Sequence, residues 1–395
     1  MLETPDVSTF QPFLMERYMS RFEQVVDFNL SESGVHPISL RELLDEQPEA
    51  LDEIMRTPLN YPHVNGTPEL RDRIAALYEG ATRDHVLVTV GAIEANFITT
   101  HALLQPGDEM VVMLPNYMQI WGVAKNHGVH VESFNLREAD GWAPDLAELD
   151  AVVSPRTQLI AVCNPNNPTG RVLNGGEMDA IVNAADRVGA WILADEVYRG
   201  AERVGAAESP SFYGRYDKLV AVGSLSKAYG LPGLRLGWLV APAAVVQDAW
   251  ARHEYTTLSA TMLSNKIAAI ALSGAVRPAL IARTRRYIRH GYPVLRQWMQ
   301  AHERTFRVVA PDAAAIAFAR YTLDIESTEL TERLRREKSV LVVPGAHFGL
   351  DRFVRISFGL PHGTLVPALE RFRELVEELG GSRTDASGER QDRRA

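Results

Sequence analysis

Residues 219–238 read Leu-Val-Ala-Val-Gly-Ser-Leu-Ser-Lys-Ala-Tyr-Gly-Leu-Pro-Gly-Leu-Arg-Leu-Gly-Trp. The four apolar residues that open this stretch are typical of a buried strand. Ser224, Ser226 and Lys227 follow, and Arg235 lies eight residues after the lysine. Burial lowers the pKa of a lysine and so makes it a nucleophile or base, while two hydroxyls and a guanidinium suit a phosphate. The stretch alone also allows a second interpretation, a strand end with an ordinary surface lysine.

The composition is that of a globular protein. The chain has 395 residues, 46% hydrophobic and 23% charged, which is enough for two domains or one large one. A formal net charge of −9 argues against binding nucleic acid or a membrane surface. Cys163 is the single cysteine, so no internal disulfide forms and we expect a reducing, cytoplasmic location. We see neither a signal peptide at the N-terminus nor an apolar run of the ~18 residues that a membrane span needs.

Strands and helices alternate through the middle of the chain. This alternation predicts an α/β fold with an open, mostly parallel sheet that is covered on both faces. Ligands of such sheets bind beyond the carboxyl ends of the strands. We expect strands at 85–90, 110–114, 129–134, 157–163, 191–195 and 219–224, with helices at 92–104, 117–126, 145–153 and 177–188.

The two ends of the chain have a different pattern. Helical spacing predicts helices at 10–28 and 39–51, and Thr67-Pro68 is typical of a helix start. After residue 242 we expect long helices at 243–257, 262–272 and 279–302, short strands at 306–309, 315–320, 340–343 and 353–358, and a closing helix at 364–379. The predicted organisation is an N-terminal arm and part of a small domain (1–45), a large domain (46–275), a small α+β domain (276–380) and a disordered tail (381–395).

Two further motifs follow predicted strands. Asn-Pro-Asn-Asn-Pro-Thr-Gly occupies 164–170, and Asp-Glu-Val-Tyr occupies 195–198. With Ser-Leu-Ser-Lys at 224–227, they make the sequence resemble the class I and II aminotransferases, which are fold-type I enzymes that use pyridoxal 5'-phosphate (PLP). The resemblance covers about residues 29–375. A lysine that forms a Schiff base beside a phosphate cradle is what PLP requires.

The resemblance implies a role for each motif residue around the cofactor ring. Lys227 matches the Schiff-base lysine, which also shuttles the α-proton. Asp195, 32 residues earlier, matches the carboxylate that pairs with the pyridine nitrogen. Asn167 and Tyr198 match the donors to the phenolate oxygen. Tyr117 matches the aromatic residue that stacks on the ring, although a tyrosine at a helix start is also common in a core.

The phosphate site that the resemblance implies has several parts. Free amides at a helix start bind anions, and the hydroxyls and guanidinium of the opening stretch complete the set. Tyr61 matches a tyrosine that reaches the phosphate of the neighbouring subunit, so the resemblance implies a homodimer with shared active sites. The expected phosphate residues are Gly91, Ala92, Ile93, Ser224, Ser226, Arg235 and Tyr61.

The resemblance also implies a substrate site. Arg355 matches the arginine that clamps the α-carboxylate of the substrate, with Arg352 as the competing candidate. Gly34 matches a loop glycine that approaches the same carboxylate. The stretch 31–36, Ser-Glu-Ser-Gly-Val-His, departs from most aminotransferases. Together with 226–237, 255–259 and 340–349, it is similar to the capreomycidine synthases of the same fold. His36 is then either a substrate contact or a loop histidine bonded to backbone.

Three functions are therefore weighed. The first is transamination between an L-amino acid and a 2-oxo acid. The second is a PLP-dependent lyase or cyclase of the capreomycidine synthase type, acting on a β-hydroxylated, guanidino amino acid. The third is a PLP-binding regulator or inactive homologue, which would need a DNA-binding domain or a lost lysine. Residues 1–30 are too short for such a domain, and Lys227 is present. We expect no metal site.

Overall fold

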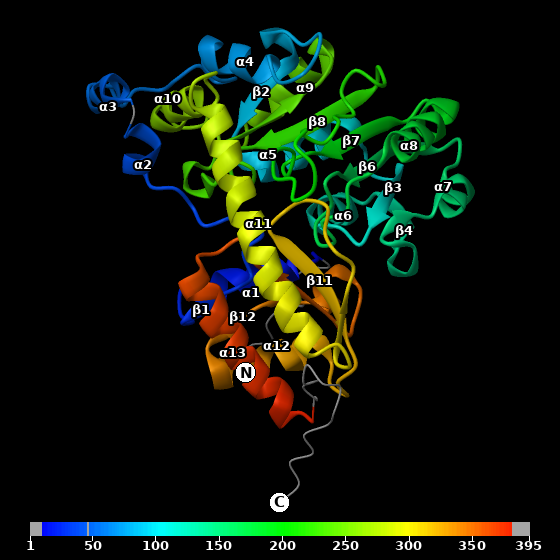
Figure 1. Cartoon of the computed structure of the whole chain (residues 1–395). Helices are drawn as coiled ribbons and strands as arrows, with labels where there is room; N and C mark the ends of the chain where they lie inside the picture. Colours follow the sequence, from blue (N-terminus) through cyan, green and yellow to red (C-terminus); the bar gives the residue numbers. More distant parts are fainter. Residues whose placement is uncertain (1–9, 46, 381–395) are drawn as a thin grey trace, which may run out of the picture.

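The computed structural model describes residues 10–45 and 47–380. Residues 1–9 of the expected N-terminal arm and the tail expected at 381–395 lie outside the described residues. The chain forms an upper body around a large sheet and a lower body around a smaller sheet, and the long helix α11 (Arg277–Ala301) runs from one to the other (Figure 1). The domain boundaries themselves stay predictions.

An eight-stranded sheet forms the centre of the upper body. Its strand order is β2-β9-β8-β7-β6-β3-β4-β5, and the four pairs from β8 to β4 are all parallel. The pairs β2–β9, β8–β9 and β4–β5 are antiparallel, so the expected mostly parallel sheet is confirmed. The strands are β2 (Val86–Thr89), β3 (Glu109–Leu114), β4 (His130–Arg137), β5 (Ala143–Pro144), β6 (Thr157–Cys163), β7 (Trp191–Asp195), β8 (Leu219–Ser224) and β9 (Gly237–Val240).

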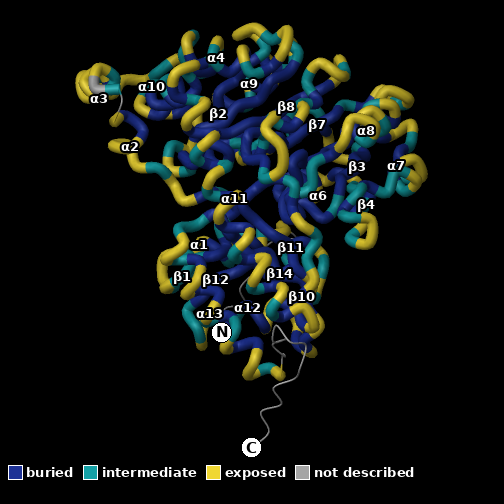
Figure 2. Tube along the Cα trace, in the orientation of Figure 1, coloured by how far each residue is buried: buried dark blue, intermediate teal, exposed yellow. Residues whose placement is uncertain are grey.

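Helices cover both faces of this sheet, as the strand–helix alternation predicts. Alternate residues of β6 belong to two hydrophobic clusters. Leu159 packs in the cluster that contains Ala95, and Ile160 packs in the cluster that contains Ile181. The strands are therefore buried on both sides, while the outer turns of the helices are exposed (Figure 2). The helices of this body are α4 (Pro68–Ala75), α5 (Gly91–Leu103), α6 (Gln119–Asn126), α7 (Leu146–Val152), α8 (Gly175–Val188), α9 (Ala243–His253) and α10 (Met262–Ala271).

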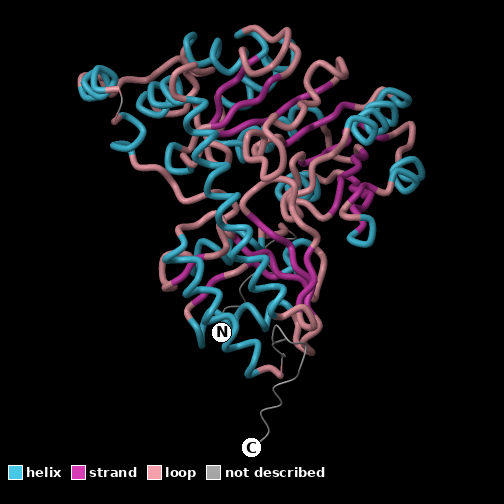
Figure 3. The backbone as a smooth tube through the Cα atoms, viewed as in Figure 1, coloured by secondary structure: helices cyan, strands magenta, loops and turns pink. Residues whose placement is uncertain are grey.

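The lower body contains a four-stranded sheet in the order β10-β11-β14-β13. Figure 3 shows its strands as a second group, separate from those of the large sheet. The N-terminal segment joins this body, because β1 (Phe28–Asn29) pairs in parallel with β12 (Val340–Leu341). The remaining strands are β10 (Phe306–Val308), β11 (Ile316–Tyr321), β13 (Val343–Pro344) and β14 (Phe353–Ser357), and the remaining helices are α1 (Leu14–Phe22), α12 (Ser327–Lys338) and α13 (His362–Glu378).

The structure differs from the sequence predictions at several elements; the helix expected at 10–28, for example, covers only Leu14–Phe22. The helix expected at 39–51 is two helices, α2 (Leu40–Leu44) and α3 (Pro48–Met55). Proline has no amide hydrogen, so Pro48 starts a helix and does not continue one. Sequence reasoning missed β9 because its four residues follow a Gly-Leu-Pro-Gly turn signal, and it missed α12, whose sequence is mostly polar.

Candidate active site

A cavity of about 370 Å³ lies where the two bodies meet and at the carboxyl ends of the large sheet's strands. Most of the residues expected at the site line it together. They come from the last residues of β7 and β8, from the loops after β3, β6, β7 and β8, from the start of α5, and from β14 of the small sheet. The expected residues that line the cavity are Ala92, Ile93, Tyr117, Asn167, Asp195, Tyr198, Ser224, Ser226, Lys227, Arg235 and Arg355.

Lys227 lies in the tight loop between β8 and β9. Its pKa is lowered mainly because burial disfavours the charged form, and Arg355 adds to this, whereas the charge of Glu32 opposes it. Among the residues that the structure describes, no ion pair includes Lys227. The loop carrying Gly34 packs against it, since a Cβ at position 34 would lie 3.4 Å from the carbonyl oxygen of Ser226. A buried amine with a lowered pKa is a suitable nucleophile and proton carrier.

Asp195 is the last residue of β7, and its carboxylate is buried. Asn96 of α5 donates from Nδ2 to Oδ2 of Asp195 at 2.9 Å, and the backbone amide of Val197 donates to Oδ1 at 3.2 Å. Burial nevertheless raises the pKa of Asp195. The pKa stays raised although these two hydrogen bonds and the charge of Lys227 lower it. A protonated ring nitrogen would supply the positive partner that this buried carboxylate lacks among the described residues.

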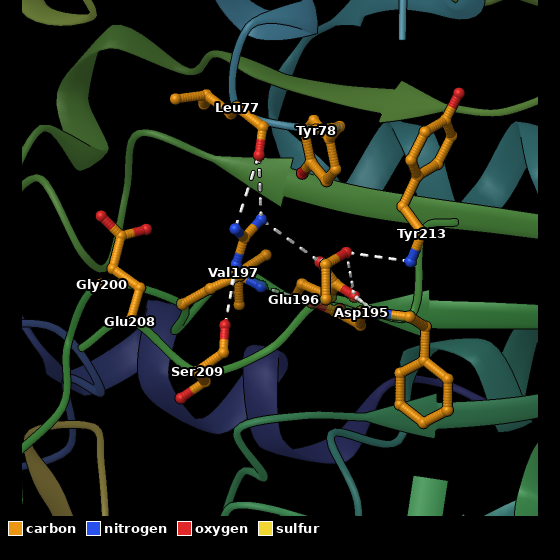
Figure 4. Close-up of polar contacts among 12 residues, drawn as sticks. Leu77, Tyr78, Asp195, Glu196, Val197, Gly200, Glu208, Ser209 and Tyr213 are labelled. Carbon is orange, nitrogen blue, oxygen red and sulfur yellow. Dashed lines mark hydrogen bonds and ion pairs between the residues drawn. The ribbon is translucent and has the colours of Figure 1, made fainter. Parts of the chain in front are cut away.

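A second polar network lies beside Asp195, around Glu196. The Glu196 carboxylate accepts hydrogen bonds from the Ser211 hydroxyl (2.7 Å) and the Phe212 amide (2.7 Å), and it lies 3.9 Å from Nη1 of Arg199. Figure 4 shows Glu196 next to Asp195 within this network. Burial raises the pKa of Glu196 to about 7, against the effect of Arg199 and of these hydrogen bonds. The network fixes the strand end that carries Asp195.

Arg355 of β14 reaches the loop after β6. Its Nη1 donates to Oδ1 of Asn167 at 2.9 Å, and its Nη2 donates to the carbonyl oxygen of Ser31. The side chain is 1% exposed, and burial lowers its pKa. No carboxylate forms an ion pair with it among the described residues, and Nε has no hydrogen-bond partner. Tyr198 completes this side of the cavity and donates its hydroxyl to Oγ of Ser33 at 2.8 Å.

The opposite end of the cavity has the groups expected for a phosphate. Gly91 begins α5 with φ +77°, a left-handed conformation that favours glycine, and a Cβ there would lie 2.7 Å from Nη2 of Arg235, so a larger residue would displace this guanidinium from the helix start. The hydroxyl of Ser224 donates to Oγ of Ser226 at 2.9 Å. Two hydroxyls, a guanidinium and the first turn of a helix are suitable ligands for a phosphate dianion.

Three other candidates lie outside this cavity. Tyr61 is 81% exposed in the loop between α3 and α4. His36 is exposed, with its ring 6.1 Å from that of Tyr287, so the structure does not bring it into the cavity. Arg352, the alternative clamp, pairs with Asp324 at 3.2 Å on the surface. Arg355 and not Arg352 therefore points into the cavity.

Sequence reasoning missed several residues that line the cavity. Glu16 of α1 accepts a hydrogen bond from the Tyr117 hydroxyl at 2.7 Å. Asn96 is missed although it lies five residues after Gly91 on α5, because a buried polar residue on an apolar helix has no motif of its own. The missed lining residues are Met15, Glu16, Met19, Glu23, Glu32, Ser33, Asn96, Gln119, Cys163, Val197 and Pro232.

The family of the chain follows from this fold and site together with sequence comparison. The model of the family described as aminotransferase class I and II matches residues 29–372, and the chain belongs to this family. It is therefore a PLP-dependent enzyme of the aminotransferase class.

Three known proteins show the range of its relatives. The chain is 34% identical to a capreomycidine synthase of Streptomyces vinaceus, over 96% of this chain and 95% of that protein. A PLP-dependent aminotransferase structure from Streptococcus suis superposes with a TM-score of 0.88 at 30% identity, over 94% of this chain and 99% of the other. The structure of the PLP-dependent cyclase OrfR superposes with a TM-score of 0.84 at 28% identity, over 96% of this chain and 100% of the other.

The residues of the cavity fit PLP. Arg235 with the serine hydroxyls suits its phosphate, Asp195 suits its ring nitrogen, and Lys227 offers an amine without an ion-pair partner among the described residues. No helix within the described ranges is long and apolar enough to cross a membrane. In the same ranges, no group of three or more His, Cys, Asp or Glu is arranged to hold a metal ion.

Proposed function

We propose that this enzyme moves an amino group between an L-amino acid and a 2-oxo acid. The observation that carries the proposal is Arg355, a buried guanidinium in the cavity of Lys227 that has no ion-pair partner among the described residues. A planar guanidinium binds a carboxylate bidentately. Its position in this cavity supports a substrate whose carboxylate pairs with Arg355 and whose α-carbon faces Lys227.

The proposed roles follow from the positions of the side chains. When bound, PLP draws electrons from the α-carbon of an amino acid. Lys227 would hold the cofactor covalently, then take the α-proton on Nζ and return it. Asp195 would keep the ring nitrogen protonated, with Asn96 holding the carboxylate in place. Asn167 and Tyr198 would donate to the ring oxygen, Tyr117 would stack on the ring, and Gly34 would let the backbone approach the substrate carboxylate.

A second candidate function is supported by one specific comparison. The 34% identity to a capreomycidine synthase extends over 96% of the chain, and a cyclase is among the similar structures. In a lyase or cyclase, Lys227 would remove the same α-proton, but a substituent on the β-carbon would leave before the proton returned. Both functions use the same residues, so the reaction products distinguish them.

The proposal also includes a homodimer. Tyr61 is 81% exposed in this chain and lies outside its cavity. Exposure at this position supports a role in the site of a second subunit, where its hydroxyl would contact the phosphate.

One experiment decides between the two reactions. The holoenzyme is incubated with a panel of amino acids, some with a β-hydroxyl group, while the cofactor spectrum and the products are followed. Transamination predicts conversion of the cofactor to its amine form and release of one 2-oxo acid per site. A cyclic product or loss of the β-substituent, with the cofactor spectrum restored, would instead identify the second function.

A further inference from the structure

A buried glutamate lies in the first turn of α5, the helix whose start we assign to the cofactor phosphate. Glu94 is 7% exposed, and its carboxylate lies outside the cavity of Lys227. The backbone amide of Val90 donates to Oε2 of Glu94 at 2.6 Å, immediately before the helix begins at Gly91. This contact fixes the chain where it enters the helix, so the direction of the free amides in the first turn depends on Glu94.

The other oxygen of the same carboxylate contacts the end of α9 and the turn after it. Nδ1 of His253 lies 3.1 Å from Oε1, and the hydroxyls of Thr256 and Thr257 donate to the same atom, the latter at 2.7 Å. Burial alone would raise the pKa of Glu94, but the hydrogen bonds that it accepts, first of all that of His253, lower the pKa to about 2. The carboxylate is therefore ionised and holds α5 against this turn.

His253 extends the network to a third segment. Its side chain is fully buried, and Nε2 lies 3.2 Å from the carbonyl oxygen of Val64. The two partners of the ring, a carboxylate and a carbonyl, only accept hydrogen bonds, so both contacts form when each ring nitrogen carries a hydrogen. The resulting imidazolium is paired with Glu94, as a buried charge requires.

Val64 lies three residues after Tyr61, in the loop between α3 and α4. The next residue anchors this loop a second time, because the amide of Val88 on β2 donates to the carbonyl oxygen of Asn65 at 3.1 Å. The proposed function assigns Tyr61 to the phosphate site of a second subunit, whereas the start of α5 belongs to the site of its own subunit. The buried charged pair thus connects two segments that serve two different phosphates.

We infer that Glu94 and His253 are positioning residues for the cofactor phosphate. Their charged pair holds the start of α5 for one site and the Tyr61 loop for the site of the second subunit. The inference rests on the proposed function, which supplies the place of the phosphate and the homodimer. Because neither side chain lines the cavity, loss of the pair should weaken only the part of the cofactor affinity that the phosphate contributes.

The test compares PLP with pyridoxal, which has the same ring but no phosphate. The full chain is titrated with each compound, and the ratio of the pyridoxal to the PLP dissociation constant measures the contribution of the phosphate. Glu94→Gln keeps the shape of the side chain and removes its charge, so we expect the ratio to fall by roughly tenfold, which is about 1.4 kcal/mol. Phosphorus NMR of the holoenzyme gives a second readout, since the resonance of the bound phosphate should move toward that of free PLP.

A second buried glutamate provides the matched control. Glu109 is 8% exposed and accepts hydrogen bonds from two hydroxyls and a guanidinium, those of Ser154, Thr157 and Arg156. It begins β3, at the end of the strand opposite to the cavity. Glu109→Gln therefore makes the same chemical change at a comparable site, and the ratio should not change.

The link to Tyr61 is tested with a variant of the histidine. His253→Asn places an amide nitrogen near the position of Nδ1, so it keeps a hydrogen bond to Glu94 and loses the one to Val64. It should lower the ratio by roughly threefold in the wild-type background. In the Tyr61→Phe background the same substitution should have a smaller effect, because the loop then lacks the hydroxyl that it positions.

The outcomes separate a positioning role from a general structural one. Equal weakening of PLP and pyridoxal by Glu94→Gln, or an equal fall of the ratio in Glu109→Gln, would overturn the inference. Equal effects of His253→Asn in the two backgrounds would overturn its second half, the link to Tyr61. The proposed function has a separate readout, the change that amino acids cause in the cofactor spectrum, and would fail if the unmodified holoenzyme showed none, whatever the ratio.

Discussion

Nη1 of Arg355 donates a hydrogen bond to Oδ1 of Asn167 over 2.9 Å, although 188 residues separate the two in the sequence. The contact joins β14 of the small sheet to the loop after β6 of the large sheet. A guanidinium proposed to bind the substrate is thereby held against an amide proposed to bind the cofactor, so the distance between substrate and cofactor depends on how the two bodies meet.

Removal of the Arg355 side chain should weaken substrate binding selectively. Truncating one partner of a buried charged pair costs on the order of 2–5 kcal/mol, so Arg355→Ala should raise the dissociation constant of amino acids by roughly 30-fold or more. Arg355→Lys should recover only part of this affinity, since an ammonium cannot form the forked pair. Spectral titration measures both.

The surface arginine provides the control for this prediction. Arg352→Ala removes a side chain paired with Asp324 outside the cavity, and substrate affinity should not change. PLP affinity should be nearly the same in all three variants. Expulsion of the cofactor by Arg355→Ala, or loss of substrate binding in Arg352→Ala, would show that the carboxylate site is assigned wrongly.

Lys227 should carry the cofactor. Its lowered pKa increases the neutral, nucleophilic fraction of the amine near neutral pH. Reduction of the holoenzyme with borohydride, followed by peptide mapping, should place the pyridoxyl group on the peptide that contains Lys227. Lys218, which donates to the carbonyl of Gly189 outside the cavity, should stay unlabelled, and a label found there would contradict the assignment.

The contribution of Tyr61 should be visible in mixed dimers. Tyr61→Phe and Lys227→Ala homodimers should each lose most activity, because every site lacks one group. Random mixing of the two should restore about a quarter of the wild-type activity. Half of the dimers are then heterodimers, and each heterodimer has one intact site and one doubly mutated site. Activity is measured after co-refolding of the two variants. A mixture no more active than its components would argue against composite sites.

Glu196 should make the stability of the fold depend on pH. Its pKa is raised to about 7 by burial, so between its ordinary pKa of 4.5 and 7 the folded state binds more protons than the unfolded state. The free energy of unfolding should therefore fall as pH rises through this window, by on the order of 3 kcal/mol at most. Glu196→Gln should not show this loss. Compared with the wild type, the variant should therefore be more stable at pH 8 than it is at pH 5.

Chemical denaturation at pH 5 to 8 tests this prediction. The difference in unfolding free energy between Glu196→Gln and the wild type should grow with pH, whereas Glu132→Gln, an exposed control, should follow the wild-type curve. Parallel curves for Glu196→Gln and the wild type would mean that Glu196 is ionised in both states across this range.

The sequence predicted more of the large sheet than of its surroundings. Apolar runs bounded by turn residues placed β6, β7 and β8 to within a residue, because strands buried on both faces leave a continuous apolar signal. The antiparallel strand β9 is four residues long, and short apolar runs give no such signal. The polar helix α12 packs through few buried side chains, so its sequence pattern was equally weak.

The sequence by itself predicted which residues meet at the end of the cavity where we propose that the cofactor binds. Asp195, Lys227 and Arg235 all follow predicted strands, and the carboxyl ends of parallel strands meet at one edge of a sheet, so their order along the chain already places them together. Only the tertiary structure shows that α1 lies at this edge, so that Glu16 and Glu23 line the cavity. It also shows that His36 lies outside the cavity. These contacts join segments up to 340 residues apart, as between Met15 and Arg355, and they form only when the two bodies pack together. Local pattern specifies local structure, whereas the packing of distant segments depends on the whole buried surface at once.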